Sequence, residues 1–465
     1  MIPIVTPTEM AAIDAAAPEP VEELIERAGA ALARTTLDML GGSYGRRVTV
    51  LAGKGNNGAD GRAAARRLKL RGVRVAVIDA ADAPASLPAA HLAIDAAYGT
   101  GLRRPYSPPA IPAFLDRPGC SAPVLAADIP SGVDGLTGEI HGQAWTAEQT
   151  VTFGALKPGL VLHPGAQHCG QVTVASIGLD ISAARTHMVT ADDVSSWLPV
   201  RPAEAHKWQT ACWVIAGSPG MTGAAHLAAT AAMRGGSGYV RLSTPGLTHD
   251  PVAPTEAVGC PLPADNWGTA ACAGDLSRFK AMLVGPGLSQ QANTVESVRD
   301  LIAKVQLPLV VDGDGLSALG TDAPDVLIHR TAPTVLTPHD GEYRVLTGSA
   351  PESDRFAAAR SLAATTGAHV LLKGPTTVVA APDGDALAVA NGDARLATAG
   401  TGDVLAGLIC GLLSAEVEPM NAAAAAAWLH GQAANTRPAG GMAASDLLLA
   451  LPKVWEAAAQ QEATP

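Results

Sequence analysis

An oxygen-rich glycine turn near the start of the chain holds the first residues that could do chemistry. The stretch VTVLAGKGNNGADG places Gly53, Gly55 and Gly58 between a β-branched run and a helical pattern. Glycines at this spacing allow a tight turn, and the next helix offers free backbone N–H groups to a phosphate of a dinucleotide. The same turn carries two asparagines and an aspartate, whose oxygens suit a hard cation. A dinucleotide site, a cation site or both are indicated.

Further polar residues follow other β-rich runs in the same half of the chain. Asp95 closes LAID, and Asp128 closes VLAAD three residues before Ser131. Because the carboxyl ends of parallel strands open into one crevice, we expect these three side chains and Asn57 to converge there. A single aspartate at a strand end can also be a simple helix cap. Three such loops in succession favour a site.

A second glycine turn, TAGTGDVLAG, lies near the end of the chain. Gly400 and Gly402 permit the turn, Asp403 falls in the first turn of a helix, and apolar residues follow at helical spacing. The positive end of such a helix can bind phosphate, and the aspartate can accept a proton from the group being phosphorylated. A capped helix with a glycine-rich lead-in is the structural alternative. We interpret the stretch as a phosphoryl-transfer site.

The elements that must position these residues form two series. Short β-rich runs alternate with helical or turn-rich stretches from Val48 to about Leu179, as in a parallel sheet covered on both faces. A second series begins with CWVIAGS and continues through LPLVVDGDG, TVLTPH and HVLLKG. The segment 181–202 has mixed polar character and contains the boundary. We therefore expect an α/β protein with two domains, 1–185 and 190–465.

Composition limits the possible classes. A chain of 465 residues is too long for one core, and its 48% apolar but only 3% aromatic residues suit closely packed α/β layers. The net charge of −11 without a basic run argues against nucleic acid or an anionic membrane as partner. Six scattered cysteines and no basic leader or long apolar stretch indicate a cytoplasmic protein without a disulfide framework or zinc site.

Four motifs of the first half point to one family. GKGNNGADG, DAAYGTGL, ADIPSGVDGLTG and TVTFGALKPGL together resemble the NAD(P)H-hydrate epimerases, a Rossmann-like family that interconverts the R and S forms of hydrated NADH or NADPH. The resemblance implies a potassium ion on Asn57, Asp95 and Ser131, with Asp128 contacting substrate and transferring the proton. It also implies that two loops bind the damaged dinucleotide, namely Asn56, Asn57, Gly58, Ala59 and Asp60, and Gly99, Thr100, Gly101, Leu102, Arg103, Arg104 and Pro105.

Motifs of the second half point to a different chemistry. GTGD before a helix resembles ribokinase-like proteins, and TVLTPHDGEYRVLTG and VLLKGPTTVVAAPDG narrow this to ADP-dependent NAD(P)H-hydrate dehydratases, from about Val189 onward. The resemblance implies that phosphorylation by ADP or ATP, with Mg²⁺, makes the ring hydroxyl a leaving group. The implied hydrate contacts are Ala224, Gly287, His339 and Asp403, with Asp403 as general base. The implied nucleotide contacts are Lys373, Gly374, Pro375, Thr376, Thr377 and Gly402.

Five positions depart from the family patterns. Ala59 replaces a usual Gly in the first turn, and Gly135 stands where an acidic residue is more usual. Trp208, Asp340 and Ala399 stand where Gly, Pro and Gly are common, and we expect all three to flank the second pocket. Ala59 strains its loop only if its φ angle is positive. We infer that the dehydratase activity is retained, and that any effect of these three departures falls on nucleotide preference or affinity.

The whole chain is thus similar to the two-domain nicotinamide nucleotide repair family, an isomerase fused to a lyase, and we expect a homo-oligomer. A ribokinase-like small-molecule kinase fused to a dinucleotide-binding domain would share GTGD, but would accumulate a phosphorylated product. A dehydrogenase would use the first turn, but leaves the second half without a role. A nucleotide sensor or scaffold would bind ligand without turnover.

Overall fold

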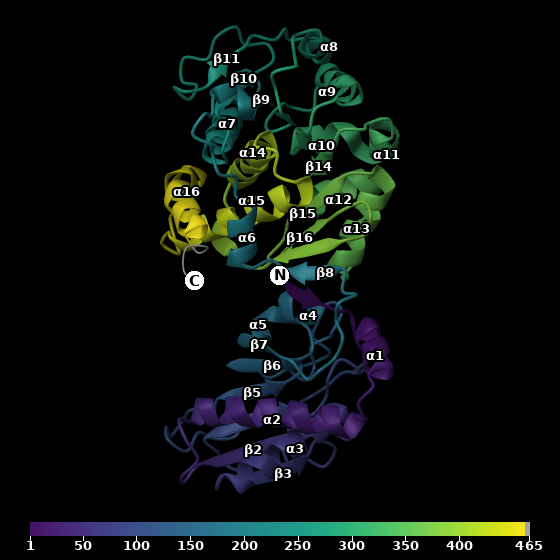
Figure 1. Ribbon diagram of the computed structural model, residues 1–465, viewed down its shortest axis with the longest axis vertical. Helices are drawn as coiled ribbons and strands as arrows, with labels where there is room; N and C mark the ends of the chain where they lie inside the picture. Colours follow the sequence, from purple (N-terminus) through teal and green to yellow (C-terminus); the bar gives the residue numbers. More distant parts are fainter. Residues whose placement is uncertain (461–465) are drawn as a thin grey trace. The chain divides into compact units, whose positions relative to one another are not determined.

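The computed structural model describes residues 1–460 and divides the chain into two compact units (Figure 1). One unit spans Ile2–Thr186, and the other comprises Met1 and the chain from His187 onward. Both units contain a largely parallel sheet with helices, as the alternation of strands and helices predicts. Among the described residues, no helix is both long and apolar enough to cross a membrane.

The N-terminal unit is built on a parallel sheet with the strand order β3-β2-β4-β5-β6-β7. Its strands are β2 (Arg47–Ala52), β3 (Arg74–Asp79), β4 (Leu92–Ala96), β5 (Val124–Ala127), β6 (Gln149–Phe153) and β7 (Gln171–Ala175), preceded by β1 (Ile2–Ile4). Its helices are α1 (Pro7–Ala16), α2 (Val21–Leu40), α3 (Asn56–Leu70), α4 (Pro158–Val161) and α5 (Ala166–Cys169).

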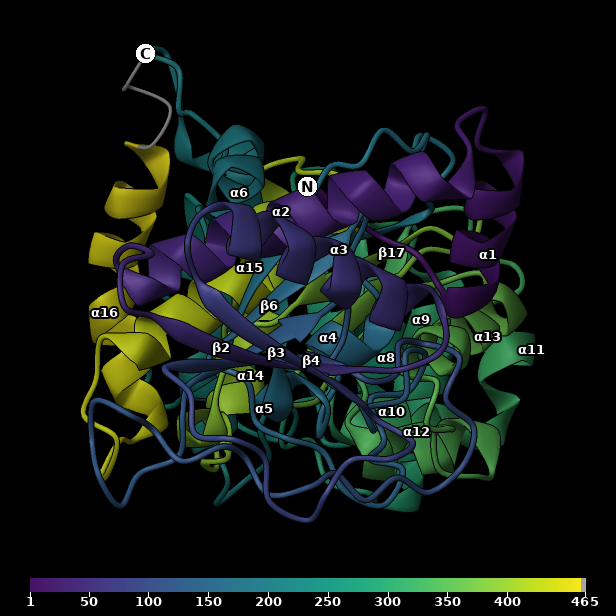
Figure 2. The ribbon, with the colours of Figure 1, turned by 90° about the horizontal axis from the view of Figure 1, so that it is seen from below.

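Helices α2 and α3 lie side by side on one face of this sheet (Figure 2). Leu32 of α2 and Leu68 of α3 pack in one core cluster with Val50 and Ile94 of the strands. The opposite face packs against loop residues such as Leu87, before β4, and Tyr106, between β4 and β5. That covering has few helical turns because the long segment between β4 and β5 is rich in proline and lacks helical periodicity. The carboxyl ends of the strands carry the polar loops.

The C-terminal unit contains a larger mixed sheet. From β8 onward its strand order is β8-β17-β16-β15-β14-β13-β12-β9-β10-β11, parallel from β15 to β11 and antiparallel at β15-β16-β17. The strands are β8 (Thr186–Met188), β9 (Ala211–Ile215), β10 (Tyr239–Ser243), β11 (Val258–Gly259), β12 (Ala281–Val284), β13 (Leu309–Val311), β14 (Thr334–Leu336), β15 (His369–Leu372), β16 (Thr377–Ala380) and β17 (Ala386–Val389).

Helices cover both faces of this second sheet. One layer consists of α6 (Ala191–Trp197), α7 (Gly223–Arg234), α14 (Thr401–Ser414), α15 (Pro419–Asn435) and α16 (Ala444–Ala459). The other helices, green in Figure 1, are α8 (Trp267–Cys272), α9 (Ala292–Lys304), α10 (Asp314–Leu319), α11 (Ala323–Leu327), α12 (Asp340–Thr347) and α13 (Arg355–Thr366). The alanine-rich helix α15 is almost fully buried, which explains how a core with few aromatics fills its space.

Close packing of α14 on α7 sets the position of the second glycine turn. A β-carbon at Gly407 would lie 2.2 Å from the Ala228 carbonyl oxygen, and one at Gly411 would lie 2.5 Å from the Ala232 carbonyl oxygen. Only glycine permits this approach of two helix backbones. The two helices therefore run side by side in a fixed register, and their first turns meet at one edge of the sheet.

Candidate active sites of the two units

The N-terminal unit has a cavity of about 730 Å³ among the loops that follow its strands. The polar turn at the start of α3 contributes Asn56, Asn57 and Asp60, and the loop after β4 contributes residues 99–104. Asp128 after β5 also lines the cavity, as do residues of α1 and α2. The cavity lining does not include Gly58, Ala59 or Pro105, which the sequence also placed at the ligand.

Carboxyl groups gather around one buried ammonium in this cavity. The Lys157 Nζ atom lies 2.5 Å from Asp128 Oδ1, and both side chains line the cavity. Burial, reinforced by the negative charge of Asp128, raises the pKa of Asp60 to about 8, although Lys157 opposes the shift. Burial also raises the pKa of Asp14, which α1 brings to the same cavity. Asp14 and Lys157 were not predicted as site residues.

Asp95 and Ser131 meet in the interior below the cavity. Ser131 donates to Asp95 through its backbone N–H (2.8 Å) and its hydroxyl (2.6 Å), and the Tyr98 N–H donates to Ser131 Oγ. A β-carbon at the neighbouring Gly99 would lie 3.6 Å from the β-carbon of Asn57. The amide oxygen and nitrogen of Asn57 are buried without a hydrogen-bond partner. Three predicted ion ligands therefore lie around one short turn.

Two of the sequence departures fit this site. Ala59 lies inside helix α3 and is not among the residues with positive φ, so its methyl group causes no backbone strain. A β-carbon at Gly135 would lie 2.8 Å from the Thr100 side chain. An acidic residue at position 135 would therefore displace the loop after β4, and glycine avoids this clash.

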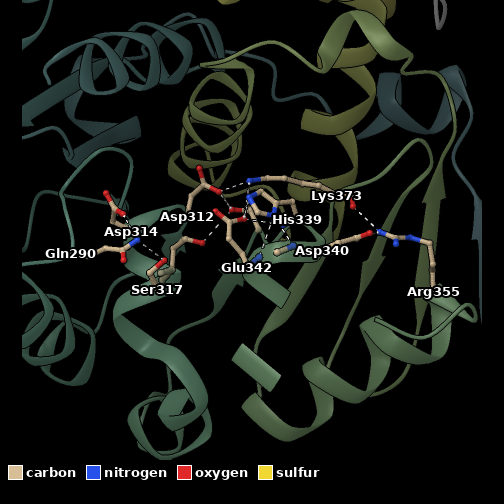
Figure 3. Close-up of polar contacts among 12 residues, drawn as sticks. Gln290, Asp312, Asp314, Ser317, His339, Asp340, Glu342, Arg355 and Lys373 are labelled. Atoms are coloured by element: carbon tan, nitrogen blue, oxygen red, sulfur yellow. Dashed lines mark hydrogen bonds and ion pairs between the residues drawn. The ribbon is translucent and has the colours of Figure 1, made fainter. Parts of the chain in front are cut away.

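The C-terminal unit brings charged residues together where β13, β14 and β15 end (Figure 3). The Lys373 Nζ atom lies 2.6 Å from Asp312 Oδ1 and 3.8 Å from Glu342 Oε2. Burial favours the neutral amine, but the charges of Asp312 and Glu342 outweigh it and raise the pKa of Lys373. Thr337 donates to the same Asp312 oxygen at 2.6 Å. Lys373 is thus a fixed cation in the expected nucleotide loop.

Asp403 lies beside this cation in the first turn of α14. A β-carbon at the adjacent Gly402 would lie 3.5 Å from Lys373 Nζ. Burial and the negative charge of Asp312 raise the pKa of Asp403 to about 6, against the opposing charge of Lys373. A carboxylate with this pKa, next to an open helix N-terminus, can accept a proton near neutral pH.

Two of the predicted hydrate contacts, Ala224 and Asp403, lie in the first turns of α7 and α14, and Gly287 lies in the loop after β12. Gly407 of α14 packs against Ala228 of α7. One helical turn earlier in both helices, the same alignment places Asp403 next to Ala224. A β-carbon at Gly287 would lie 3.0 Å from the β-carbon of Ala224. These three predicted residues are therefore neighbours.

His339, one of the predicted hydrate contacts, also caps a helix. Its Nδ1 atom accepts from the backbone N–H groups of Gly341 (2.9 Å) and Glu342 (3.2 Å), and it caps α12. Because Nδ1 is an acceptor, the neutral ring carries its proton on Nε2. The side chain is 61% exposed. His339 can therefore cap the helix and still offer a donor to a ligand.

Arg355 fixes the loop after β15 by hydrogen bonding. It was not predicted as a site residue. Its Nη2 atom donates to the Lys373 carbonyl oxygen at 2.7 Å and to Asp340 Oδ1 at 2.9 Å. Asp340, which replaces a usual proline, thus does flank the site. Thr376 in the same loop is buried. The segment 373–377 is therefore positioned in part by a side chain outside its own motif, that of Arg355.

Trp208 corrects one expectation. It lies in the short 3₁₀ turn that precedes β9, at the amino end of that strand, and stacks on Tyr239 with ring centroids 4.2 Å apart. The site residues follow the carboxyl ends of the strands. Trp208 therefore does not flank the pocket, because it precedes the strand whose far end points to the site.

The fold and the two sites define a class of protein. A Rossmann-like unit with a polar dinucleotide turn is joined to an α/β unit whose GTGD turn lies beside a partly buried lysine. This is a phosphoryl-transfer domain fused to a dinucleotide-binding domain.

Comparisons with known proteins narrow the class. A family model described as NAD(P)H-hydrate dehydratase matches residues 212–453, and one described as YjeF-related protein N-terminus matches residues 21–89 and 78–159. Bifunctional NAD(P)H-hydrate repair enzymes are 37% identical in Salinibacter ruber (93% of this chain, 91% of the relative) and 38% identical in Mycobacterium leprae (88% of each). The chain belongs to the family of bifunctional NAD(P)H-hydrate repair enzymes.

A solved structure supports the fold of the C-terminal unit. The ADP/ATP-dependent NAD(P)H-hydrate dehydratase from Bacillus subtilis, co-crystallised with ATP and Mg²⁺, superposes with a TM-score of 0.52 at 32% identity. It covers 58% of this chain and 98% of its own. The predicted family and fold class are confirmed.

Proposed function

We propose that the chain repairs hydrated nicotinamide cofactors. The N-terminal unit interconverts the R and S forms of hydrated NADH and NADPH, and the C-terminal unit dehydrates the S form at the expense of ADP or ATP. The observation that carries this proposal is the placement of Asp403 beside Lys373 at the glycine turn of α14, in a chain whose other unit carries a dinucleotide cavity. Family membership supports both halves.

The dehydratase chemistry follows from the weak leaving ability of hydroxide. Asp403 accepts the proton of the ring hydroxyl, whose oxygen attacks the terminal phosphorus of the nucleotide. Loss of the resulting phosphate, together with a proton from the adjacent ring carbon, restores the ring double bond. Ala224, Gly287 and His339 orient the hydrate. The nucleotide is bound by Lys373, Gly374, Pro375, Thr376, Thr377 and Gly402. Mg²⁺ bound with the nucleotide would supply positive charge to the phosphates.

The epimerase chemistry needs a proton-transfer group, and Asp128 is the proposed one. The loops 56–60 and 99–105 bind the dinucleotide around it. A potassium ion fits the set Asn57, Asp95 and Ser131, because the Asn57 amide is buried without a partner and Asp95 is a buried carboxyl with hydrogen-bond donors but no cationic side chain in the described part of the chain. The ion would supply the positive charge that holds this turn together.

One assay tests the proposal. Purified protein is incubated with the separate R and S hydrates, with ADP, with ATP or without nucleotide, and the absorbance of reduced nicotinamide is followed. We expect recovery from both epimers only when nucleotide is present. A phosphorylated product that persists would instead identify a small-molecule kinase, and recovery without nucleotide consumption would overturn the dehydratase proposal. We further propose a homo-oligomer acting in the cytoplasm, where reduced nicotinamide cofactors are used.

A further inference from the structure

One carboxylate oxygen of Asp128 accepts hydrogen bonds from three donors. Asp128 Oδ1 accepts from Lys157 Nζ at 2.5 Å, from Thr152 Oγ1 at 3.0 Å and from the Phe153 backbone N–H at 3.4 Å. All three donors belong to one segment, the end of β6 and the turn that follows it, whereas Asp128 follows the neighbouring strand β5. The carboxylate orientation is therefore set by the adjacent strand.

Lys157 has no N–H group left for a ligand. Its side chain is only 2% exposed, and besides Asp128 its ammonium donates to Thr152 Oγ1 at 2.9 Å and to the Phe153 carbonyl oxygen at 3.0 Å. An ammonium has three N–H donors, and three acceptors occupy them. Lys157 thus acts through Asp128.

The second oxygen of Asp128 is open to the cavity. Among the described residues, no hydrogen bond or ion pair involves Oδ2, and a β-carbon at Gly99 would lie 3.8 Å from it. Gly99 begins the loop that lines the cavity, and the Asp128 side chain is 17% exposed. Oδ1 of Asp128 therefore has three hydrogen-bond donors, whereas Oδ2 faces the cavity and is available to a ligand.

The backbone contributes to the same orientation. Asp128 has a φ of 65°, in the left-handed region, and its N–H donates to the Val151 carbonyl oxygen at 2.7 Å. Holding a non-glycine residue in this region costs free energy, and such residues are typical of functional sites. The turn directs the side chain off the strand while its N–H stays attached to β6.

The surrounding charges explain why a buried lysine is needed here. Asp14 and Asp60 line the same cavity, so Asp128 would face two other carboxyl groups without a compensating cation. Arg103 and Arg104 also line the cavity, but Arg103 is 68% exposed. The ammonium of Lys157 is the buried positive charge in direct contact with Asp128.

We propose that Lys157 and Thr152 are positioning residues of the epimerase, which hold Asp128 through Oδ1 and present Oδ2 to the bound hydrate. This assignment rests on the proposed epimerase activity and deepens it. The hydrogen bonds from Lys157 and Thr152 orient the reacting carboxylate. We therefore expect them to contribute to turnover of bound substrate and to contribute little to substrate binding.

The test compares Thr152→Val, which removes the hydroxyl at nearly constant shape, with Thr152→Ser, which keeps it. Conversion of the R hydrate is measured with excess dehydratase activity and ADP, against the spontaneous rate. We expect Thr152→Val to lower kcat about 10-fold or more with KM changed less than about twofold, and Thr152→Ser to stay near the parent. Lys157→Met should lower kcat by about 100-fold. Dehydration of the S hydrate by the same chain is the folding control.

Parental kcat in Thr152→Val would overturn the positioning role, as would equal losses in Thr152→Val and Thr152→Ser, which would indicate packing alone. The Thr152 pair decides the matter even if Lys157→Met does not fold. If the unaltered chain fails to convert the R hydrate, the epimerase proposal itself falls. An active parent with an unaffected Thr152→Val overturns the positioning role only.

Discussion

The ammonium of Lys373 lies 2.6 Å from the buried carboxylate of Asp312, beside the glycine turn that begins α14. Asp312 is only 3% exposed, and it follows β13, two strands away from β15. The pair fixes one positive charge at the place where the phosphates of a nucleotide would meet the start of the helix. Asp403 shares that environment, and its burial, together with its negative neighbours, raises its pKa.

Asp403→Asn should abolish nucleotide-dependent recovery of NAD(P)H from the S hydrate, because the amide cannot accept the hydroxyl proton. Loss of a general base lowers kcat by about 10² to 10⁴-fold. The measurement is the rate of absorbance recovery with saturating ADP, and conversion of the R to the S hydrate by the same chain is the control. Full dehydratase activity in this variant would exclude Asp403 as the base.

The dehydratase rate should fall in acid through a single ionisation near pH 6. Asp403 must be ionised to act as base, and burial with the charges of Asp312, Glu342 and Asp314 raises its pKa to about 6 while Lys373 opposes them. Activity is therefore present above this pH and is lost below it. The profile of kcat/KM for the S hydrate checks the prediction. Asp340→Asn should leave the profile in place, since Asp340 is not among those charges.

Much of both sites could be predicted from sequence because the functional residues follow strands in short motifs. Parallel strands bring their carboxyl ends to one edge, so Asp95 and Asp128 could be assigned to a site without knowing any contact, whereas Lys373 was assigned from the resemblance of its KGPTT motif. The error at Trp208 has a related cause. A residue just before a strand lies at the opposite edge of the sheet from a residue just after it. The motif around Trp208 does not show where the following strand begins.

The supporting residues could not be predicted in this way. Asp14 comes from the separate helix α1, and Arg355 reaches its loop from the start of α13, so neither lies in a recognisable motif. Lys157 and Glu342 stand inside quoted motifs, TFGALKPGL and TPHDGE, yet their roles depend on side-chain orientation. The sequence signal available for Lys157 is that it is the single charged residue in the otherwise uncharged stretch TVTFGALKPGL.

Arg355→Met should weaken nucleotide binding more than turnover. Arg355 holds the Lys373 carbonyl oxygen at 2.7 Å, so its loss frees the loop 373–377. We expect the KM for ADP to rise about 10-fold, with kcat changed by less than about threefold, in steady-state assays with saturating S hydrate. Asp340→Asn is the matched variant: Asp340 is 61% exposed, so its ion pair with Arg355 should contribute little. Equal effects of the two variants would contradict the prediction.

Asp60→Asn should stabilise the N-terminal unit while impairing epimerisation. The folded-state pKa of about 8 lies above the ordinary value of 3.8, so folding requires proton uptake and stability falls as pH rises between these values. Asparagine removes that dependence, and we expect a gain of about 4 kcal/mol at pH 7, which lies about three pH units above the ordinary pKa. Urea unfolding of parent and variant at pH 5 and pH 7 measures it. A gain that does not grow with pH would show that Asp60 ionises in the folded protein.

The epimerase should require potassium, because Asn57 needs the ion as a partner for its side-chain oxygen. The Asn57 amide oxygen is buried without a partner, beside the turn held by Asp95 and Ser131, and a large monovalent cation would satisfy it. Replacing K⁺ by a bulky organic cation should slow conversion of the R hydrate at least 10-fold, and Asn57→Leu should be slow in both salts. Dehydration of the S hydrate is the control for general salt effects. If conversion of the R hydrate is equally fast in both salts, the three residues do not form an ion site, and the Asn57 amide must instead be paired by the substrate.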